Sequence, residues 1–240
     1  MPSSTDEFAV VRQQISLRFA DVRAFWSSAK AQAVPPPQPQ PFSYLAGSGF
    51  TIVFLYAALE FAITRGVKQL SQLITAYPVR TKDVSTPIMC LVHDPKVNAI
   101  RDAGRKTRLD ARLRLFTAVK SPDTAKIHDE LLAPELQNVW FKSISDTFQM
   151  FGISDYPLND AASEALIDRI VNDRNAVAHG RESPDIVGSR YTSGDIDALV
   201  GRIESEGQFI INRFADFYAD RRFIHESDRS RYLKREARAP

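Results

Sequence analysis

The sequence predicts an all-α protein: an antiparallel helical bundle with an extra helix at its N-terminus. Apolar residues recur at spacings of three and four over long stretches, and no stretch alternates apolar and polar residues as a strand would. Prolines and glycines fall between these stretches, where helices are expected to end. With 240 residues, 44% of them apolar and 25% charged, the composition is that of an ordinary folded globular protein.

Composition also narrows the chemistry that we expect. Cys90 is the single cysteine, so neither an intrachain disulfide nor a cysteine zinc site can form. The four histidines lie far apart, and none has the spacing of a metal-binding pair on a helix. We therefore expect no metal and no cofactor. The formal net charge of +2 is too small to indicate a polyanionic partner by itself.

The expected compartment is the cytoplasm. The N-terminus, MPSSTDEF, has neither the basic nor the apolar region of a secretory signal. The most apolar stretch, residues 50–63, has 14 residues and includes Glu60, so it is too short and too charged to cross a bilayer. It predicts a buried core helix, and we expect no membrane partner.

Residues 1–33 are expected to form the N-terminal helix, started by a capping box of Ser4 and Glu7. Its apolar stripe needs a partner surface and consists of Phe8, Val11, Ile15, Phe19, Val22 and Trp26. A linker follows at 34–43, where VPPPQPQPF holds five prolines in nine residues and predicts an extended polyproline-II spacer. We favour a stiff connector between two helices over a ligand for a proline-recognition domain.

The helical bundle is expected over residues 44–220. Its central helix runs from about residue 48 until Pro78 stops it. The next helix starts at Thr86 and is interrupted by Pro95.

Residues 96–120 form a basic segment, with eight Lys or Arg against two Asp. Its later half predicts an amphipathic helix with one cationic face. The apolar positions of that helix are Leu109, Leu113, Phe116 and Val119.

Further helices are expected at residues 126–138, 140–151, 161–179 and 195–218. Gly152 ends one of them, and Gly180 caps another, which Pro184 prevents from continuing. The tail, residues 221–240, carries seven basic residues against three acidic ones and is expected to be partly disordered.

The stretch with recognisable chemistry is residues 170–181, IVNDRNAVAHGR. Asn175 and His179 are four residues apart on the predicted helix and so share a face, which Arg174 flanks. An imidazole can move protons near neutral pH. A guanidinium can grip phosphate oxygens and stabilise developing negative charge. Such a trio suits a phosphodiester whose own 2′-hydroxyl is the nucleophile, and only RNA carries that group.

The same residues resemble a known motif. RNAVAHG is similar to the R-x4–6-H signature of HEPN domains, with the Asn after the Arg that is common in their nuclease members. Three other segments look like the RiboL-PSP-HEPN group: LYAALEFA at 55–62, LVHDPKVNAIRD at 91–102 and FGI at 151–153. The resemblance covers roughly residues 45–220, most of the chain.

This resemblance implies an all-α homodimer in which two motif copies meet in one composite site. It implies metal-independent RNA cleavage by 2′-hydroxyl attack, leaving a 2′,3′-cyclic phosphate. Carried over by position, Arg174 and His179 are catalytic and Asn175 supports them, with His179 as acid or base and Arg174 as phosphate clamp. Many such nucleases are toxins or anti-phage defence effectors, so the implied partners are RNA and an antitoxin or defence-system protein.

Two carboxylates are the predicted supporting residues. Glu60 sits among apolar neighbours, and a buried carboxylate needs a partner. It either holds Arg174 or His179, as the matching polar residue does in related domains, or forms a polar edge of the core helix. Asp173 is the other supporting candidate and could pair with Arg174.

The predicted RNA contacts are basic. Residues 154–220 carry thirteen acids against six arginines, which is poor for holding a polyanion. The basic segment supplies a phosphate track if it packs beside the motif, and is otherwise a solvated face. The candidates are Arg101, Arg105, Lys106, Arg108, Arg112 and Arg181. Arg181 stands where some HEPN toxins have a tyrosine that a partner nucleotidyltransferase modifies, so that route of silencing is not expected, although Tyr191 lies nearby.

The sequence leaves two alternatives to the nuclease. One is a non-catalytic HEPN module that dimerises or binds RNA or nucleotides as a scaffold. The intact Arg, Asn and His favour the nuclease over it. The other is a nucleotide-binding transferase, which lacks support because AGSG at 46–49 is too short for a phosphate-cradling loop.

Overall fold

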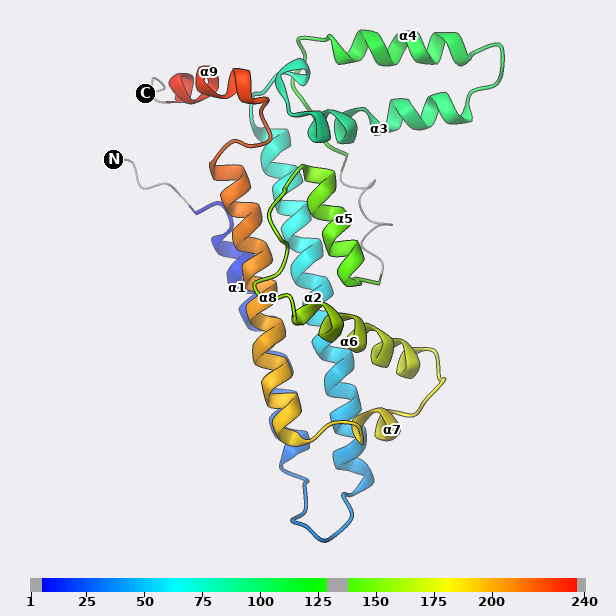
Figure 1. Ribbon diagram of the computed structural model, residues 1–240, viewed down its shortest axis with the longest axis vertical. Coiled ribbons are helices and arrows are strands. Elements are labelled where there is room, and N and C mark those ends of the chain that lie inside the picture. Colours follow the sequence, from blue (N-terminus) through cyan, green and yellow to red (C-terminus); the bar gives the residue numbers. More distant parts are fainter. Residues whose placement is uncertain (1–5, 129–137, 237–240) are drawn as a thin grey trace. The chain divides into compact units, whose positions relative to one another are not determined.

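The protein is all-α, as predicted. Residues 6–128 and 138–236, which the computed structural model describes, contain nine α-helices, one 3-10 helix and no named strand (Figure 1). The helices are α1 (Ala9–Lys30), α2 (Phe42–Ala76), η1 (Thr81–Asp83), α3 (Thr86–Asp102), α4 (Arg108–Val119), α5 (Phe141–Phe151), α6 (Ser163–Ala178), α7 (Pro184–Gly188), α8 (Ser193–Ala219) and α9 (Glu226–Glu236).

Two compact units make up the chain, and each is described by itself. Of the described residues, unit 1 contains 6–66, 138–144 and 156–212. Unit 2 contains 67–128, 145–155 and 213–236. The helices α2, α5 and α8 each contribute residues to both units.

In unit 1, the first helix buries its predicted stripe. All six stripe residues, from Phe8 to Trp26, are buried. Ser4 of the expected capping box lies outside the described residues. Asp6 acts at the helix start, because its Oδ1 accepts a hydrogen bond of 3.1 Å from the Phe8 amide.

The surface that receives this stripe includes α8, which runs beside α1 and α2 in Figure 1. The Trp26 indole donates to Asp197 of α8 at 2.7 Å, and Lys30 donates to the same carboxylate at 2.5 Å. Arg65 of α2 donates to Gln14 of α1 at 3.1 Å. Polar contacts thus hold the three helices in register around the apolar stripe.

The proline-rich linker is a closed turn and not the extended spacer that we expected. The Gln40 side chain donates to the Val34 carbonyl at 2.7 Å and accepts from the Val34 amide at 3.1 Å. These two hydrogen bonds close the loop between Val34 and Gln40. The helix α2 then begins at Phe42, several residues earlier than predicted.

The long helix α2 is the core helix that the sequence predicted. By length and composition it could cross a membrane, but 61% of its most apolar window is buried within the protein. Near its start it passes very close to α7: a Cβ on Gly49 would stand 1.9 Å from the Pro184 carbonyl oxygen. Only glycine fits there. The short helix α7, which follows α6 in the chain, therefore packs directly against α2.

In unit 2, α3 and α4 form a helical hairpin (Figure 1). The predicted interruption at Pro95 is wrong, because α3 continues through it to Asp102. Proline removes one helical hydrogen bond at a cost of about 3 kcal/mol. Tertiary packing of α3, which includes its contacts with α4, offsets that cost.

The helix α4 forms as predicted, but its apolar stripe is not buried. Leu109, Leu113 and Phe116 are 66%, 58% and 65% exposed. Ala111, on the opposite side, is the buried residue of this helix. The face of α4 that carries the small residue Ala111 therefore packs on α3, and the larger apolar residues point outward.

The C-terminal tail is more ordered than expected, because residues 226–236 form α9. Arg231 and Tyr232 each donate to the buried Asp83 carboxylate at 2.7 Å. The expected helix at 126–138 lies mostly outside the described residues, and residues 126–128 are not helical. The predicted helices at 140–151, 161–179 and 195–218 are confirmed as α5, α6 and α8.

Candidate functional site

The motif lies on α6 and ends with it. Gly180 has φ +64°, a left-handed conformation that glycine adopts without strain. Its amide donates to the Val177 carbonyl at 3.1 Å, and the Arg181 amide donates to the Ala176 carbonyl at 2.9 Å. These two bonds form a Schellman cap, which confirms the predicted C-cap and fixes His179 as the last residue before the turn.

Arg174 is held in place by a ring and two amides. Its Cζ lies 4.5 Å from the centroid of the Tyr56 ring on α2, in a cation–π contact. Its Nη1 donates to Asn175 Oδ1 at 2.7 Å and to Asn138 Oδ1 at 3.2 Å. The structure thereby brings Arg174 and Asn175 together, and the Asn175 amide acts by orienting the guanidinium.

Tyr56 connects this cluster to Glu60. The Tyr56 hydroxyl donates to Glu60 Oε1 at 3.1 Å and accepts from the Val139 amide at 3.1 Å. Burial is the main reason that the pKa of Tyr56 is raised, with the nearby Glu60 carboxylate adding to the effect. Within the described residues Glu60 forms no ion pair with Arg174, and its link to the Arg174 cluster is the hydrogen bond from the Tyr56 hydroxyl.

Tyr56 and Asn138 are site residues that sequence reasoning missed. For Tyr56 the sequence held a usable pattern: tyrosine stands four residues before Glu60, a spacing that places both side chains on one helix face. Periodicity alone assigned the ring to the apolar core, where it also belongs, since Tyr56 is 1% exposed.

Asp173 supports a different part of the site. Its buried carboxylate accepts a hydrogen bond from Arg190 Nη1 at 2.6 Å and another from the Tyr191 hydroxyl. Burial and the bond to Asp173 raise the pKa of Tyr191. The structure therefore places Asp173 against the segment that follows the motif and not against Arg174.

His179 is exposed, and its imidazole has no hydrogen-bond partner among the described residues. The Nη2 and Nε donors of Arg174 are likewise unengaged within that part of the chain. A guanidinium with unused donors and an imidazole without a partner among the described residues thus lie five residues apart, about 1.4 helical turns, near the end of α6. This arrangement can bind an anionic oxygen and exchange a proton.

The model of one protein family matches residues 18–204, most of the chain, and its description is RiboL-PSP-HEPN. The chain belongs to the RiboL-PSP-HEPN family. Searches of curated proteins and of solved structures each found no match. HEPN membership indicates a nuclease or RNA-binding role, and the Arg174–His179 stretch lies inside the matched region.

The remaining RNA-binding candidates divide between the units. Arg181 belongs to unit 1 and is exposed, two residues after His179. Its backbone amide completes the cap of α6. Unit 2 holds the others, on and between α3 and α4, all exposed. They are Arg101, Arg105, Lys106, Arg108 and Arg112. Arg101 pairs with Asp102 at 3.2 Å, and Arg108 donates to the Ala103 carbonyl at 3.3 Å.

Metal-binding arrangements are absent from the described part of the chain, where no three His, Cys, Asp or Glu side chains gather suitably. Tyr191 is 5% exposed and bonded to Asp173. Its hydroxyl is therefore poorly placed for modification by another protein.

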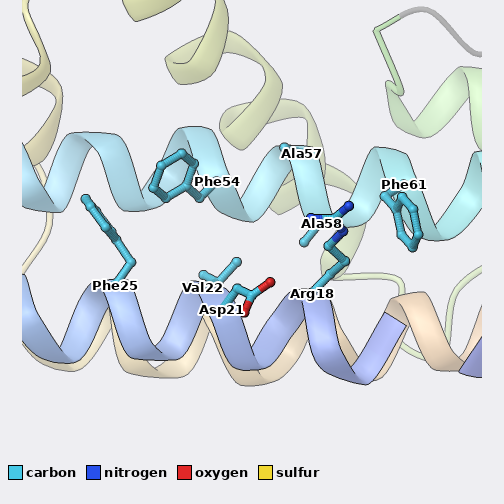
Figure 2. A pocket seen from close by; sticks show the side chains of 8 residues that line it. All are labelled: Arg18, Asp21, Val22, Phe25, Phe54, Ala57, Ala58 and Phe61. Atoms are coloured by element: carbon cyan, nitrogen blue, oxygen red, sulfur yellow. The ribbon is translucent and has the colours of Figure 1, made fainter. Parts of the chain in front are cut away.

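Unit 1 of this HEPN protein also has an apolar groove of 410 Å³ between α1 and α2. Figure 2 shows its lining: Arg18, Asp21, Val22, Phe25, Phe54, Ala57, Ala58 and Phe61. Phe25 and Phe54 meet edge to face with centroids 4.7 Å apart, and Arg18 lies 4.9 Å from the Phe61 centroid. Phe54 remains 44% exposed. The groove thus offers apolar contact surface and lacks a histidine for proton transfer.

Proposed function

We propose that this protein is a metal-independent endoribonuclease of the HEPN type. The observation that carries the proposal is the Arg174 cluster. The guanidinium lies on the Tyr56 ring, is oriented by the side chains of Asn175 and Asn138, and keeps two donor groups unused within the described residues. His179 follows on the same helix and has no hydrogen-bond partner in that part of the chain. A pre-oriented guanidinium stabilises charge that develops on a phosphate in the transition state. Membership in the RiboL-PSP-HEPN family supports the proposal that Arg174 and His179 act on RNA.

The proposed reaction needs one base and one acid. The base takes the proton of the RNA 2′-hydroxyl, and O2′ bonds to the adjacent phosphorus. The bond from phosphorus to O5′ then breaks, and the acid protonates the leaving O5′. The products are a 2′,3′-cyclic phosphate and a 5′-hydroxyl, and His179 serves as the acid or the base.

A homodimer supplies both roles at once, because each copy contributes one His179 to a composite site. We infer this assembly from the family resemblance. We place the protein in the cytoplasm, as a toxin or anti-phage effector restrained by a partner protein.

Cleavage of total RNA by the purified chain tests the proposal. Arg174→Ala and His179→Ala should each abolish fragmentation and leave the helical circular dichroism intact. Arg23→Ala and His225→Ala change an exposed arginine on α1 and an exposed histidine before α9, and should cut as the parent does. Parental activity in both site variants would refute the assignment.

The alternative is a non-catalytic HEPN module that binds RNA or a nucleotide as a scaffold. The acidic character of residues 154–220, thirteen acids against six arginines, opposes binding of a polyanion at the motif and so counts against cleavage there, whereas a scaffold can bind RNA through the basic residues of 96–120. A parent protein that binds RNA but produces no fragments would support the scaffold.

A further inference from the structure

A polar pocket of 420 Å³ lies in unit 2, beside α3 and the segment that follows α4. Its polar lining includes Thr81, His93, Lys96, Thr124, Lys126 and His128. The wall is held by backbone pairing: Arg80 and Thr124 form an antiparallel bridge, and the Thr81 amide and hydroxyl donate to the Asp123 carbonyl at 2.8 and 3.0 Å. The pocket is therefore built on fixed backbone.

His93 is the unusual residue of this wall. It is 4% exposed, and neither ring nitrogen has a hydrogen-bond partner among the described residues. Burial, and then the neighbouring Lys96 ammonium, lower the pKa of His93. A neutral imidazole still has one N–H donor and one acceptor, and leaving them unpaired in a buried position is costly. The ring thus has unused hydrogen-bonding capacity in the pocket wall. Neighbouring atoms cover both nitrogens, so the ring must rotate before a ligand can use that capacity.

The charges around the pocket favour an anion. Lys96 and Lys126 are exposed and have no ion-pair partner within the described residues. Asp123 is the acid among the described lining residues. Its carboxylate accepts from the Ser121 hydroxyl at 2.5 Å and keeps its charge, so the two lysines still outweigh it. Two ammonium groups repel a metal ion, whereas they attract a group with two negative charges.

We propose that this pocket binds a phosphate monoester of about nucleotide size, with Lys96 and Lys126 on the phosphate and His93 as a buried donor. A phosphate monoester carries close to two negative charges at neutral pH, which matches the two ammonium groups. The volume falls within the range of small-ligand pockets and exceeds what a bare ion fills. All lining residues belong to unit 2, whereas the Arg174 cluster belongs to unit 1, so the two sites share no residue.

Calorimetric titration of AMP into the full chain tests this site. Each lysine is expected to make a charge-assisted hydrogen bond to the phosphate. Lys96→Met and Lys126→Met should therefore each lower the affinity for AMP about tenfold. Lys234→Met removes an equally exposed charge from α9 of the same unit, and should change the affinity by less than about twofold. Both lysines are on the surface, so these variants should fold as the parent does.

Three further measurements identify the ligand group. AMP should shift the ring ¹⁵N resonances of His93, and the same addition to Lys96→Met plus Lys126→Met should not. Adenosine should not bind, because it lacks the phosphate. Inorganic phosphate should bind more weakly than AMP, and equal affinities would assign the pocket to free phosphate.

Besides equal affinities for AMP and inorganic phosphate, either of two results overturns the proposal. One is the absence of AMP binding up to about 5 mM, beyond which affinity is too weak to indicate a built site. The other is binding that Lys96→Met and Lys126→Met leave unchanged. Neither result bears on RNA cleavage, which the His179→Ala and Arg174→Ala variants test independently.

Discussion

Replacing Tyr56 by Phe isolates the hydroxyl that organises the Arg174 cluster. The ring remains, so the cation–π contact with Arg174 is preserved. The lost hydroxyl accepts from the Val139 amide, and Val139 is fully buried, so that amide is left unpaired at a cost of about 1–3 kcal/mol. Glu60 loses one donor, but it is partly exposed and water replaces the bond. We expect a loss of about 2 kcal/mol in the free energy of unfolding.

Thermal unfolding followed by circular dichroism measures this loss. For a chain of this length, about 2 kcal/mol lowers the melting temperature by about 4–8 °C. Tyr156→Phe is the matched control, since Tyr156 is 43% exposed and its hydroxyl bonds to Glu164 at the surface. The control should shift by less than about 1 °C. Equal shifts for the two variants would refute the role given to the Tyr56 hydroxyl.

Four other changes test the account of unit 1 by thermal or urea unfolding. Gly180→Ala forces a positive φ on alanine and should cost about 1 kcal/mol, whereas Gly201→Ala, in open space within α8, should stabilise by about 0.5–1 kcal/mol. A destabilised Gly201→Ala, or an unaffected Gly180→Ala, would contradict this reasoning. Glu206→Leu removes the buried acceptor of two backbone amides and a serine hydroxyl just before α6, and should cost about 3 kcal/mol; a loss below 1 kcal/mol would contradict that role. The hydrogen bond from Lys30 is the main reason that the pKa of Asp197 is lowered. This carboxylate therefore stabilises the fold above its unfolded pKa, and the benefit is lost progressively as pH falls from there through the lower folded pKa. Asp197→Asn should therefore lose less stability than the parent between pH 7 and pH 3, and an equal loss would argue against the linkage.

Helix positions were largely predictable because they depend on local patterns. The buried stripe of α1 and the glycine cap after His179 follow from residue spacing and from φ preferences that neighbours do not alter. The residues of the motif could be named for the same reason, since an R-x4-H spacing on a helix needs no tertiary information. Their supporting contacts could not be named, because Tyr56 reaches Arg174 only after α2 and α6 have packed.

The wrong predictions share a physical cause. Periodicity shows that one face of a helix is apolar, but not whether another element covers it, and Leu113 of α4 is accordingly exposed. Proline carries a local penalty at Pro95 that the tertiary packing of α3 outweighs. The linker closes because Gln40 returns to Val34, a side-chain contact that composition does not reveal.

The central claim is that Arg174 and His179 cleave RNA without a metal. The most direct test is incubation of total RNA with the purified parent and with His179→Ala, both in EDTA, followed by analysis of the fragment ends. The account predicts fragments from the parent alone, each ending in a 2′,3′-cyclic phosphate with a 5′-hydroxyl on the other product. Fragments with 3′-hydroxyl ends, cleavage lost in EDTA, or equal cleavage by His179→Ala would contradict it.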